Sequence, residues 1–167
     1  HRRRSGQTAD RDPGGGAGNA TYSLGGDGGF GGGSGLGGGD QGYGGGDSYA
    51  TVIEDTHGGG GGGGLGGAVF NHGGLLAVIN STLYANTAQG GDAIAQGGAG
   101  IGGAVFNLNG SVAILNSTLV SNTVIAGKGN WLDGWSEGGA LYNLRYTLDG
   151  GIPDALITIS NSILTGN

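Results

Sequence analysis

Short apolar segments separated by glycine and asparagine make up residues 65–167 of this 167-residue chain. In the first such stretch the apolar segments are residues 68–70, 76–79 and 82–84. Each segment is too short for a stable helix and contains β-branched or aromatic residues, which favours β-strand. The pattern therefore predicts an all-β fold built from short strands.

The same pattern occurs three times, in residues 65–88, 101–124 and 138–167. The first two copies are identical at 14 of 24 positions, and a glycine pair begins each copy at Gly66, Gly102 and Gly138, 36 residues apart. We interpret each copy as a coil of about 23 residues with three strands and three corners, which buries its apolar side chains only when coils stack. The repeats therefore predict a right-handed parallel β-helix, a solenoid.

Asparagines follow the predicted strands and are expected at the corners. Asparagine tolerates left-handed backbone angles, and asparagines that stack on successive coils form amide ladders. A nine-residue insertion around residues 146–153 lengthens the third copy. The predicted columns are Asn71, Asn107 and Asn143; Asn80, Asn116 and Asn161; and Asn86, Asn122 and Asn167.

Two apolar rows are also expected to stack inside the coils. The first consists of Val69, Val105 and Leu141, and the second of Ile79, Leu115 and Ile159.

The stretches between copies, residues 89–100 and 125–137, are expected to loop out from one corner. The second stretch carries Trp131 and Trp135. Exposed aromatic rings of this kind bind sugars or a neighbouring subunit, so both are candidates for a ligand or subunit contact. The alternative is a loop that folds its own rings onto the β-helix.

The repeated GGAVFN and NSTLxxNT motifs resemble the repeats of the polymorphic outer membrane protein type, which occur in bacterial surface and secreted proteins. The resemblance covers about residues 65–167. It implies a pectate-lyase-like right-handed β-helix, a location outside the cell or at its surface, and a role in adhesion or structure. It transfers no catalytic residue.

Glycine accounts for 47 residues and is concentrated in residues 14–64. Such a stretch behaves as a flexible linker or forms extended helices with three residues per turn that pack together. We predict a segment that is mostly non-regular or polyglycine-II-like. The expected organisation is a tail (1–13), this glycine-rich segment packing on or preceding the solenoid (14–64), and the repeats (65–167).

The charge distribution and the residue types limit which partners and cofactors are expected. From Pro13 onward only Lys128 and Arg145 oppose ten carboxylates, which leaves no basic stripe for nucleic acid. No apolar run approaches the roughly 20 residues of a membrane span. Cysteine is absent, and no metal or cofactor site is predicted. Calcium near Asp27, Asp40 and Asp47 stays open as a weaker alternative, because none of them follows the glycine pattern of calcium-binding repeats.

Polar groups that could carry chemistry do not recur from coil to coil. Residues 54–57 and His72 give a weak metal signal. Sugar cleavage needs two positioned carboxylates, and no such pair is evident, so no catalytic residue is predicted. The acids and bases in or near the coils are Asp92, Asp133, Glu137, Asp149, Asp154, Lys128 and Arg145. Asn19 lies in a glycosylation sequon and is the candidate glycan site.

These observations predict a non-enzymatic extracellular or cell-surface structural protein that self-assembles into a homo-oligomer, as a fibre, filament or surface-layer subunit, through β-helix stacking. One alternative is an adhesin or carbohydrate-binding module with polysaccharide as its partner. Others are a polysaccharide lyase or hydrolase, and an ice-binding surface built from the recurring threonines.

Overall fold

The computed structural model describes residues 27–35, 39–50, 57–147 and 154–167. Strands are the only regular elements in this described part, which confirms the predicted all-β fold. The chain divides into two compact units. We call them the sheet unit (Leu65–Ala88, Ile101–Ile125 and Ser136–Asn167) and the glycine-rich unit (His1–Gly64, Gln89–Gly100 and Ala126–Trp135).

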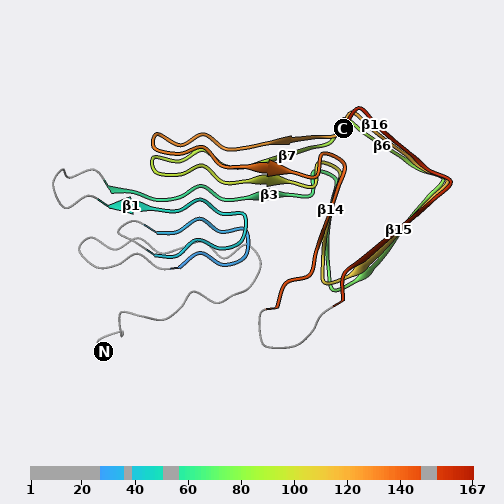
Figure 1. Cartoon of the computed structure of the whole chain (residues 1–167), viewed down its shortest axis with the longest axis horizontal. Helices are drawn as coiled ribbons and strands as arrows, with labels where there is room; N and C mark the ends of the chain where they lie inside the picture. Colours follow the sequence, from blue (N-terminus) through green and yellow to red (C-terminus); the bar gives the residue numbers. More distant parts are fainter. Residues whose placement is uncertain (1–26, 36–38, 51–56, 148–153) are drawn as a thin grey trace. The chain divides into compact units, whose positions relative to one another are not determined.

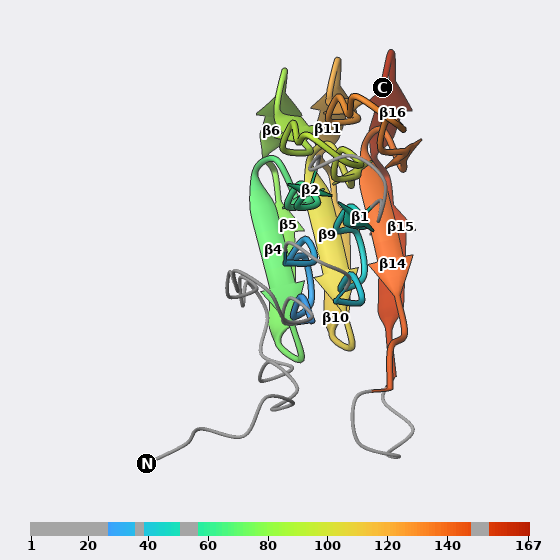
Figure 2. The same ribbon diagram turned by 90° about the vertical axis from the view of Figure 1, so that its left-hand side faces the viewer.

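Parallel strands from the three repeats lie side by side in the sheet unit (Figure 2). Three sheets have one strand from each repeat. They are formed by β4 (Val69–His72), β9 (Val105–Leu108) and β14 (Leu141–Leu144); by β5 (Leu75–Ile79), β10 (Ser111–Leu115) and β15 (Leu156–Ser160); and by β6 (Thr82–Tyr84), β11 (Thr118–Val120) and β16 (Ile163–Thr165).

Two further sheets were not expected from the sequence. One joins β7 (Thr87–Gln89) to β12 (Thr123–Ile125), and the other joins β3 (Gly64–Leu65), β8 (Gly100–Ile101) and β13 (Ser136–Glu137). The predicted count of three strands per coil was therefore too low, because two-residue and three-residue pairings leave almost no trace in an apolar pattern. A sharp corner separates β15 from β16 in Figure 1. Parallel strands stacked in sheets of this kind are consistent with a parallel β-helix.

The repeated glycine pair has two separate structural reasons. Gly66, Gly102 and Gly138 have positive φ (72°, 68° and 67°), a conformation that costs a residue with a Cβ about 1–2 kcal/mol. In the first two pairs the second glycine, Gly67 or Gly103, lies against the next coil instead. A Cβ on Gly103 would lie 1.9 Å from the carbonyl oxygen of Gly139. The pair thus forms a corner and permits close stacking at once.

The other corners also use left-handed residues in columns. One column is Asn80, Asn116 and Asn161, with φ of 50°, 49° and 46°. Another is Ala85, Ser121 and Gly166, with φ of 53°, 56° and 61°. Equivalent corners therefore repeat the same backbone geometry in each coil, although the side chains differ.

The apolar core lies between the sheets and is best buried in the middle repeat. The row Val69, Val105 and Leu141 is in register and belongs to the core or packs against it. Ile114 on β10 is fully buried, whereas its in-register partner Ile159 on β15 is 43% exposed. Burial thus falls toward the third repeat because nothing in the described residues covers its far edge.

The second predicted apolar row was wrong. Ile79 pairs with Leu115, but Leu115 pairs with Ser160 rather than Ile159. Side chains alternate between the two faces of a strand, so this shift of one position reverses the facing. Ile79 is 49% exposed and faces away from the core, while Val78, Ile114 and Ile159 form the inward row.

The insertion in the third repeat leaves the register intact. Leu141 pairs with Val105, 36 residues earlier, and Leu156 pairs with Ser111, 45 residues earlier. The additional residues are therefore confined to the connection between β14 and β15, part of which (148–153) lies outside the described residues.

In the glycine-rich unit, backbone hydrogen bonds join segments that are far apart in the sequence. Gly46 donates to Gly61 (2.7 Å), and Gly61 donates to Gln96 (2.9 Å). A short antiparallel pair, β1 (Tyr49–Ala50) and β2 (His57–Gly58), is the only sheet wholly within the described part of this unit. A buried ring, Phe30, stacks on Tyr43 with centroids 5.4 Å apart. The described segments of this unit are therefore joined mainly through their main chains.

No helix among the described residues is long and apolar enough to cross a membrane.

Candidate functional site

An asparagine ladder runs through β4, β9 and β14. Asn71 Nδ2 donates to Asn107 Oδ1, and Asn107 Nδ2 donates to Asn143 Oδ1, both at 2.7 Å. Each amide nitrogen also has a backbone acceptor in the connection that follows its strand, for example Gly110 O at 2.7 Å from Asn107. Asn107 is completely buried, so these bonds satisfy an amide that would otherwise be costly to bury.

A second ladder lies at the corner after β6, β11 and β16. Asn86 Nδ2 donates to Asn122 Oδ1, and Asn122 Nδ2 donates to Asn167 Oδ1, both at 2.8 Å. The Oδ1 atoms also accept from backbone, since the Asn86 amide N–H lies 3.1 Å from Asn122 Oδ1. This ladder therefore joins the coils through side chain and main chain together.

The third predicted column has a different role. Asn80, Asn116 and Asn161 are exposed, and no amide-to-amide bond joins them in the described part of the chain. Their positive φ shows why asparagine suits the position, because it adopts the left-handed region more readily than most residues. The sequence spacing aligned all three columns. It did not show which columns form amide ladders and which one supplies left-handed corner residues.

The two stretches between repeats stack on each other within the glycine-rich unit. Parallel bridges pair Ala93 with Gly129 and Gln96 with Leu132, both 36 residues apart. The expectation that these stretches only loop out from the solenoid was therefore incomplete, because they continue the repeat register. Gly91 and Gly127, like Gly98 and Gly134, recur at the same interval. A Cβ on Gly127 would lie 2.1 Å from Gly91 O, which explains the recurrence.

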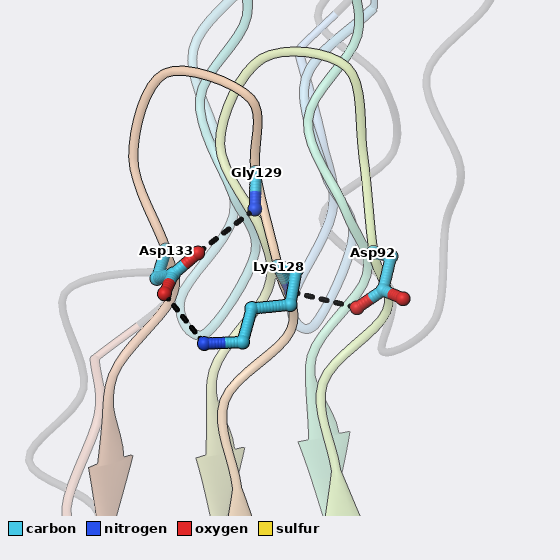
Figure 3. A network of polar contacts seen from close by, with 4 residues as sticks. All are labelled: Asp92, Lys128, Gly129 and Asp133. Carbon is cyan, nitrogen blue, oxygen red and sulfur yellow. Dashed lines mark hydrogen bonds and ion pairs between the residues drawn. The ribbon is translucent and has the colours of Figure 1, made fainter.

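A polar network closes the turn of the second stretch (Figure 3). Lys128 Nζ forms a 2.7 Å ion pair with Asp133, whose other carboxylate oxygen accepts the Gly129 N–H at 3.2 Å. From the neighbouring stretch, Asp92 accepts the backbone N–H of Lys128 at 2.6 Å. The sequence supplied each of these residues as a separate candidate acid or base, and the structure brings them together.

The charges in this network perturb one another. A hydrogen bond from the side chain of Lys128 lowers the pKa of Asp133, with a smaller effect from the Gly129 N–H. The same hydrogen bond and the Asp133 charge raise the pKa of Lys128. Both side chains are exposed, so solvent screens the pair and its role is to shape the turn rather than to stabilise the whole fold.

The two candidate tryptophans differ in their surroundings. Trp131 lies at the turn between Lys128 and Asp133 and is 57% exposed, and its backbone N–H donates to Ala95 O at 3.2 Å. Trp135 is half-buried, and its carbonyl accepts from Gly100 at 2.9 Å. The structure therefore presents Trp131 as a surface ring and does not present the two rings equally.

The remaining candidate residues form no shared site in the described part of the chain. Glu137, Arg145, Asp154 and His72 are exposed, and no group of three or more potential metal-ligating side chains occurs among the described residues. The Asp27 carboxylate accepts the backbone N–H of Asp40 at 3.0 Å, and the Asp47 carboxylate accepts the backbone N–H of Ser48 at 2.8 Å. Both carboxylates therefore bind the main chain of the glycine-rich unit. Asn19, Asp149 and residues 54–56 lie outside the described residues.

No protein-family model, no curated protein and no solved structure matches this chain.

Proposed function

We propose that this chain is a non-enzymatic extracellular structural protein that assembles end to end, each copy adding its coils to the stack of the next. The observation that carries the proposal is the direction of the asparagine ladders. In both ladders the amide nitrogen of the earlier repeat donates to the amide oxygen of the later one. Each ladder therefore has a direction, and its two ends differ: the first repeat ends in an amide oxygen and the third in an amide N–H.

The two ends of each ladder are complementary. No donor among the described residues reaches Asn71 Oδ1 at the first repeat. At the third repeat, Asn143 Nδ2 has the backbone acceptor Ala155 O at 3.0 Å but lacks the side-chain acceptor that Asn107 has. An amide oxygen at one edge thus matches an amide N–H at the other. Head-to-tail stacking of two copies would restore the 2.7 Å contact seen inside the molecule, and such an interface does not close on itself.

Six of the edge strands also lack the usual protection against pairing, whereas the edge strand β13 carries Glu137. Native proteins place lysine, proline or inward charges on exposed edges. In the described sheets β4, β5 and β6 form one edge, β14, β15 and β16 the other, and none of the six contains Lys, Arg, Asp, Glu or Pro. Inward residues of the last repeat are uncovered, with Leu164 41% exposed against none for its in-register partner Leu119.

An aromatic column supplies a third matching feature. Phe70, Phe106 and Tyr142 stack with centroid separations of 5.4 and 5.5 Å. The column ends in a ring at each edge, and a second copy that continues the register would place Tyr142 against Phe70. Aromatic pairs in this range contribute about 0.5–1.5 kcal/mol beyond their buried area.

Three finer features belong to the same proposal. We assign the sheet unit as a right-handed β-helix, since parallel crossovers are right-handed in about 98% of cases. We assign the glycine-rich unit to polyglycine-II-like segments, supported by backbone bonds such as Gly46 to Gly61 between distant stretches. The location outside the cell rests on the resemblance of the repeats to the polymorphic outer membrane protein type.

A structural rather than enzymatic role fits the titration of the charged network. A general acid in sugar cleavage needs a carboxyl whose pKa is raised. The hydrogen bond from Lys128 lowers the pKa of Asp133 instead, so this carboxyl is held in its ionised form. Asp133 is therefore unsuited to the role of general acid.

Light scattering and negative-stain electron microscopy of the 167-residue chain across a range of concentrations test the assembly. We expect the mass to rise with concentration and unbranched particles to lengthen. A single monomeric mass at every concentration up to the solubility limit would refute the proposal.

A matched pair of variants tests the ladder itself. Asn143→Asp keeps an oxygen that accepts from Asn107 Nδ2 but removes the N–H donor at the open edge. In the assembled stack the new carboxylate would lie against the Asn71 amide oxygen of the next copy, and the two acceptors would repel. The concentration needed for assembly should rise on the order of tenfold or more. Asn161→Asp adds the same charge to the same repeat at a left-handed corner outside the ladders and should leave assembly unchanged. Equal behaviour of the two variants would contradict the ladder mechanism.

A further inference from the structure

Close-packed glycines line the stems of the two stacked stretches, and several large and charged side chains lie at the turns. At these glycines the neighbouring main chain is too close for a side chain, since a Cβ on Gly97 would lie 2.0 Å from Gly127 O and a Cβ on Gly134 the same distance from Gly98 O. The turns between these stems, residues 92–96 and 128–133, contain the bulky and charged residues. We call these two turns the tip.

The tip is held in one arrangement by contacts on both sides. The bridges of Ala93 to Gly129 and Gln96 to Leu132 align the two turns. The Asp133 carboxylate closes the second turn through Lys128 and Gly129, and Asp92 links the first turn to the second (Figure 3). A loop presented on a rigid frame is the usual setting for a binding surface.

Three apolar side chains of the tip are exposed. Ile94 is 59% exposed, Trp131 57% and Leu132 60%. The two turns are in direct contact here, because the backbone N–H of Trp131 donates to the carbonyl of Ala95, the residue after Ile94, at 3.2 Å. Asn130, also exposed, adds an amide to the same turn.

We propose that the tip binds a neutral polysaccharide. Trp131 stacks on a sugar face, the Asn130 amide donates to and accepts from sugar hydroxyl groups, and the Asp92 carboxylate accepts from them. A sugar ring has one apolar face and a polar rim, which matches a turn that presents an exposed indole and, at the next residue, an exposed amide. The one cation of the tip, Lys128, is paired with Asp133. The chain body is strongly acidic, which disfavours acidic polymers.

The size of the tip favours a glycan over a protein partner. A stable protein interface needs about 800 Å² and roughly 20–30 residues on each side. The two turns supply eleven residues (five in 92–96 and six in 128–133). A few sugar units require far less surface, and one stacked ring with a few polar groups is enough to orient them.

Affinity electrophoresis of the full chain tests this proposal. Native gels are cast with hydroxyethylcellulose, dextran or galactomannan, and with pectin as the acidic control. We expect at least one neutral polymer to retard the chain, and Trp131→Ala to weaken that retardation on the order of tenfold. Trp131→Phe should keep most of it because a stacking ring remains.

Tyr84→Ala is the matched control, because Tyr84 is an exposed ring (67%) on β6 in the other unit. It should migrate as the unaltered chain does in every gel. The proposal is overturned if no neutral polymer retards the chain, if pectin alone does, or if Trp131→Ala and Tyr84→Ala behave alike. Circular dichroism of each variant establishes that it is folded before its migration is compared.

Discussion

The side-chain amide of Asn71 lies 2.7 Å from that of Asn107, although 36 residues separate them in the chain. The same distance joins Asn107 to Asn143. Three repeats are thus tied by one continuous line of polar groups beside an apolar core that is fully closed only in the middle repeat. The stability of this small fold therefore depends on individual amides to an unusual degree.

Replacing the central amide should be costly. Asn107→Ala removes the acceptor of Asn71 and the donor to Asn143 inside a fully buried site. Leaving buried polar groups without partners costs about 1–3 kcal/mol each, so we expect the free energy of unfolding to fall by about 2–4 kcal/mol. Urea denaturation followed by circular dichroism measures it. Asn130→Ala, at an exposed turn, is the control, and an equal effect of both changes would count against the ladder.

A glycine substitution should stabilise the corner at Ala85. This alanine has a φ of 53°, which costs about 1–2 kcal/mol for a residue with a Cβ. Part of the gain is lost to the larger entropy of glycine in the unfolded chain, so Ala85→Gly should add about 0.5–1 kcal/mol. Thermal unfolding gives the value. Asn80→Gly, at a corner with a φ of 50° where the residue is already suited, should add nothing or lower the stability slightly. A destabilised Ala85→Gly would show that the corner is not strained.

Two neighbouring glycines of the glycine-rich unit should respond differently to alanine. A Cβ on Gly98 would lie 2.0 Å from Gly62 O, whereas a Cβ on Gly62 meets nothing closer than Gly31 O at 3.5 Å. Gly98→Ala therefore forces the main chains apart and should cost about 1–3 kcal/mol. Gly62→Ala should be tolerated. Hydrogen–deuterium exchange of peptides from residues 57–64 and 89–100 distinguishes the two, and similar protection in both variants would contradict the close packing.

The turn at Asp133 should respond to pH at both extremes. The pKa of Asp133 is lowered in the folded chain. The ionised carboxyl therefore stabilises the turn fully above the pKa of the unfolded carboxyl, and this stabilisation is lost as pH falls through the lower folded value. The pKa of Lys128 is raised, so its contribution is present below the unfolded lysine pKa and is lost as pH rises through the higher folded value. The turn is therefore most ordered over the wide range between the two.

Nuclear magnetic resonance checks this dependence through the Gly129 amide, which donates to Asp133. Its chemical shift should titrate with the carboxyl, and Asp133→Asn should return the pKa of Lys128 toward its ordinary value. The effect should weaken in high salt because both groups are exposed. A Gly129 shift that ignores the Asp133 titration would argue against the hydrogen bond.

The stacked parallel strands followed from the sequence because the 36-residue interval fixes which residues lie side by side. Asn71 and Asn107 pair in β4 and β9 as the interval requires. The alignment of Ile159 failed because the insertion of nine residues changes the interval to 45, and a single position decides which face a side chain takes.

The stacked turns left a weaker trace. Gly91 and Gly127, and Gly98 and Gly134, preserve the repeat interval through stretches that otherwise share little. Extending the alignment through them would have predicted the bridges of Ala93 to Gly129 and of Gln96 to Leu132. The pairing of Lys128 with Asp133 has no such signal, because a turn conformation set by close glycine packing brings them together.

The unchanged register on either side of the connection between β14 and β15 has a consequence for engineering. Leu141 still pairs with Val105 and Leu156 with Ser111, although nine more residues separate Leu141 from Leu156 than Val105 from Ser111. Lengthening a flexible loop costs only about 0.6 kcal/mol per doubling. A foreign peptide spliced into that corner would be displayed once per chain without disturbing the scaffold that carries it.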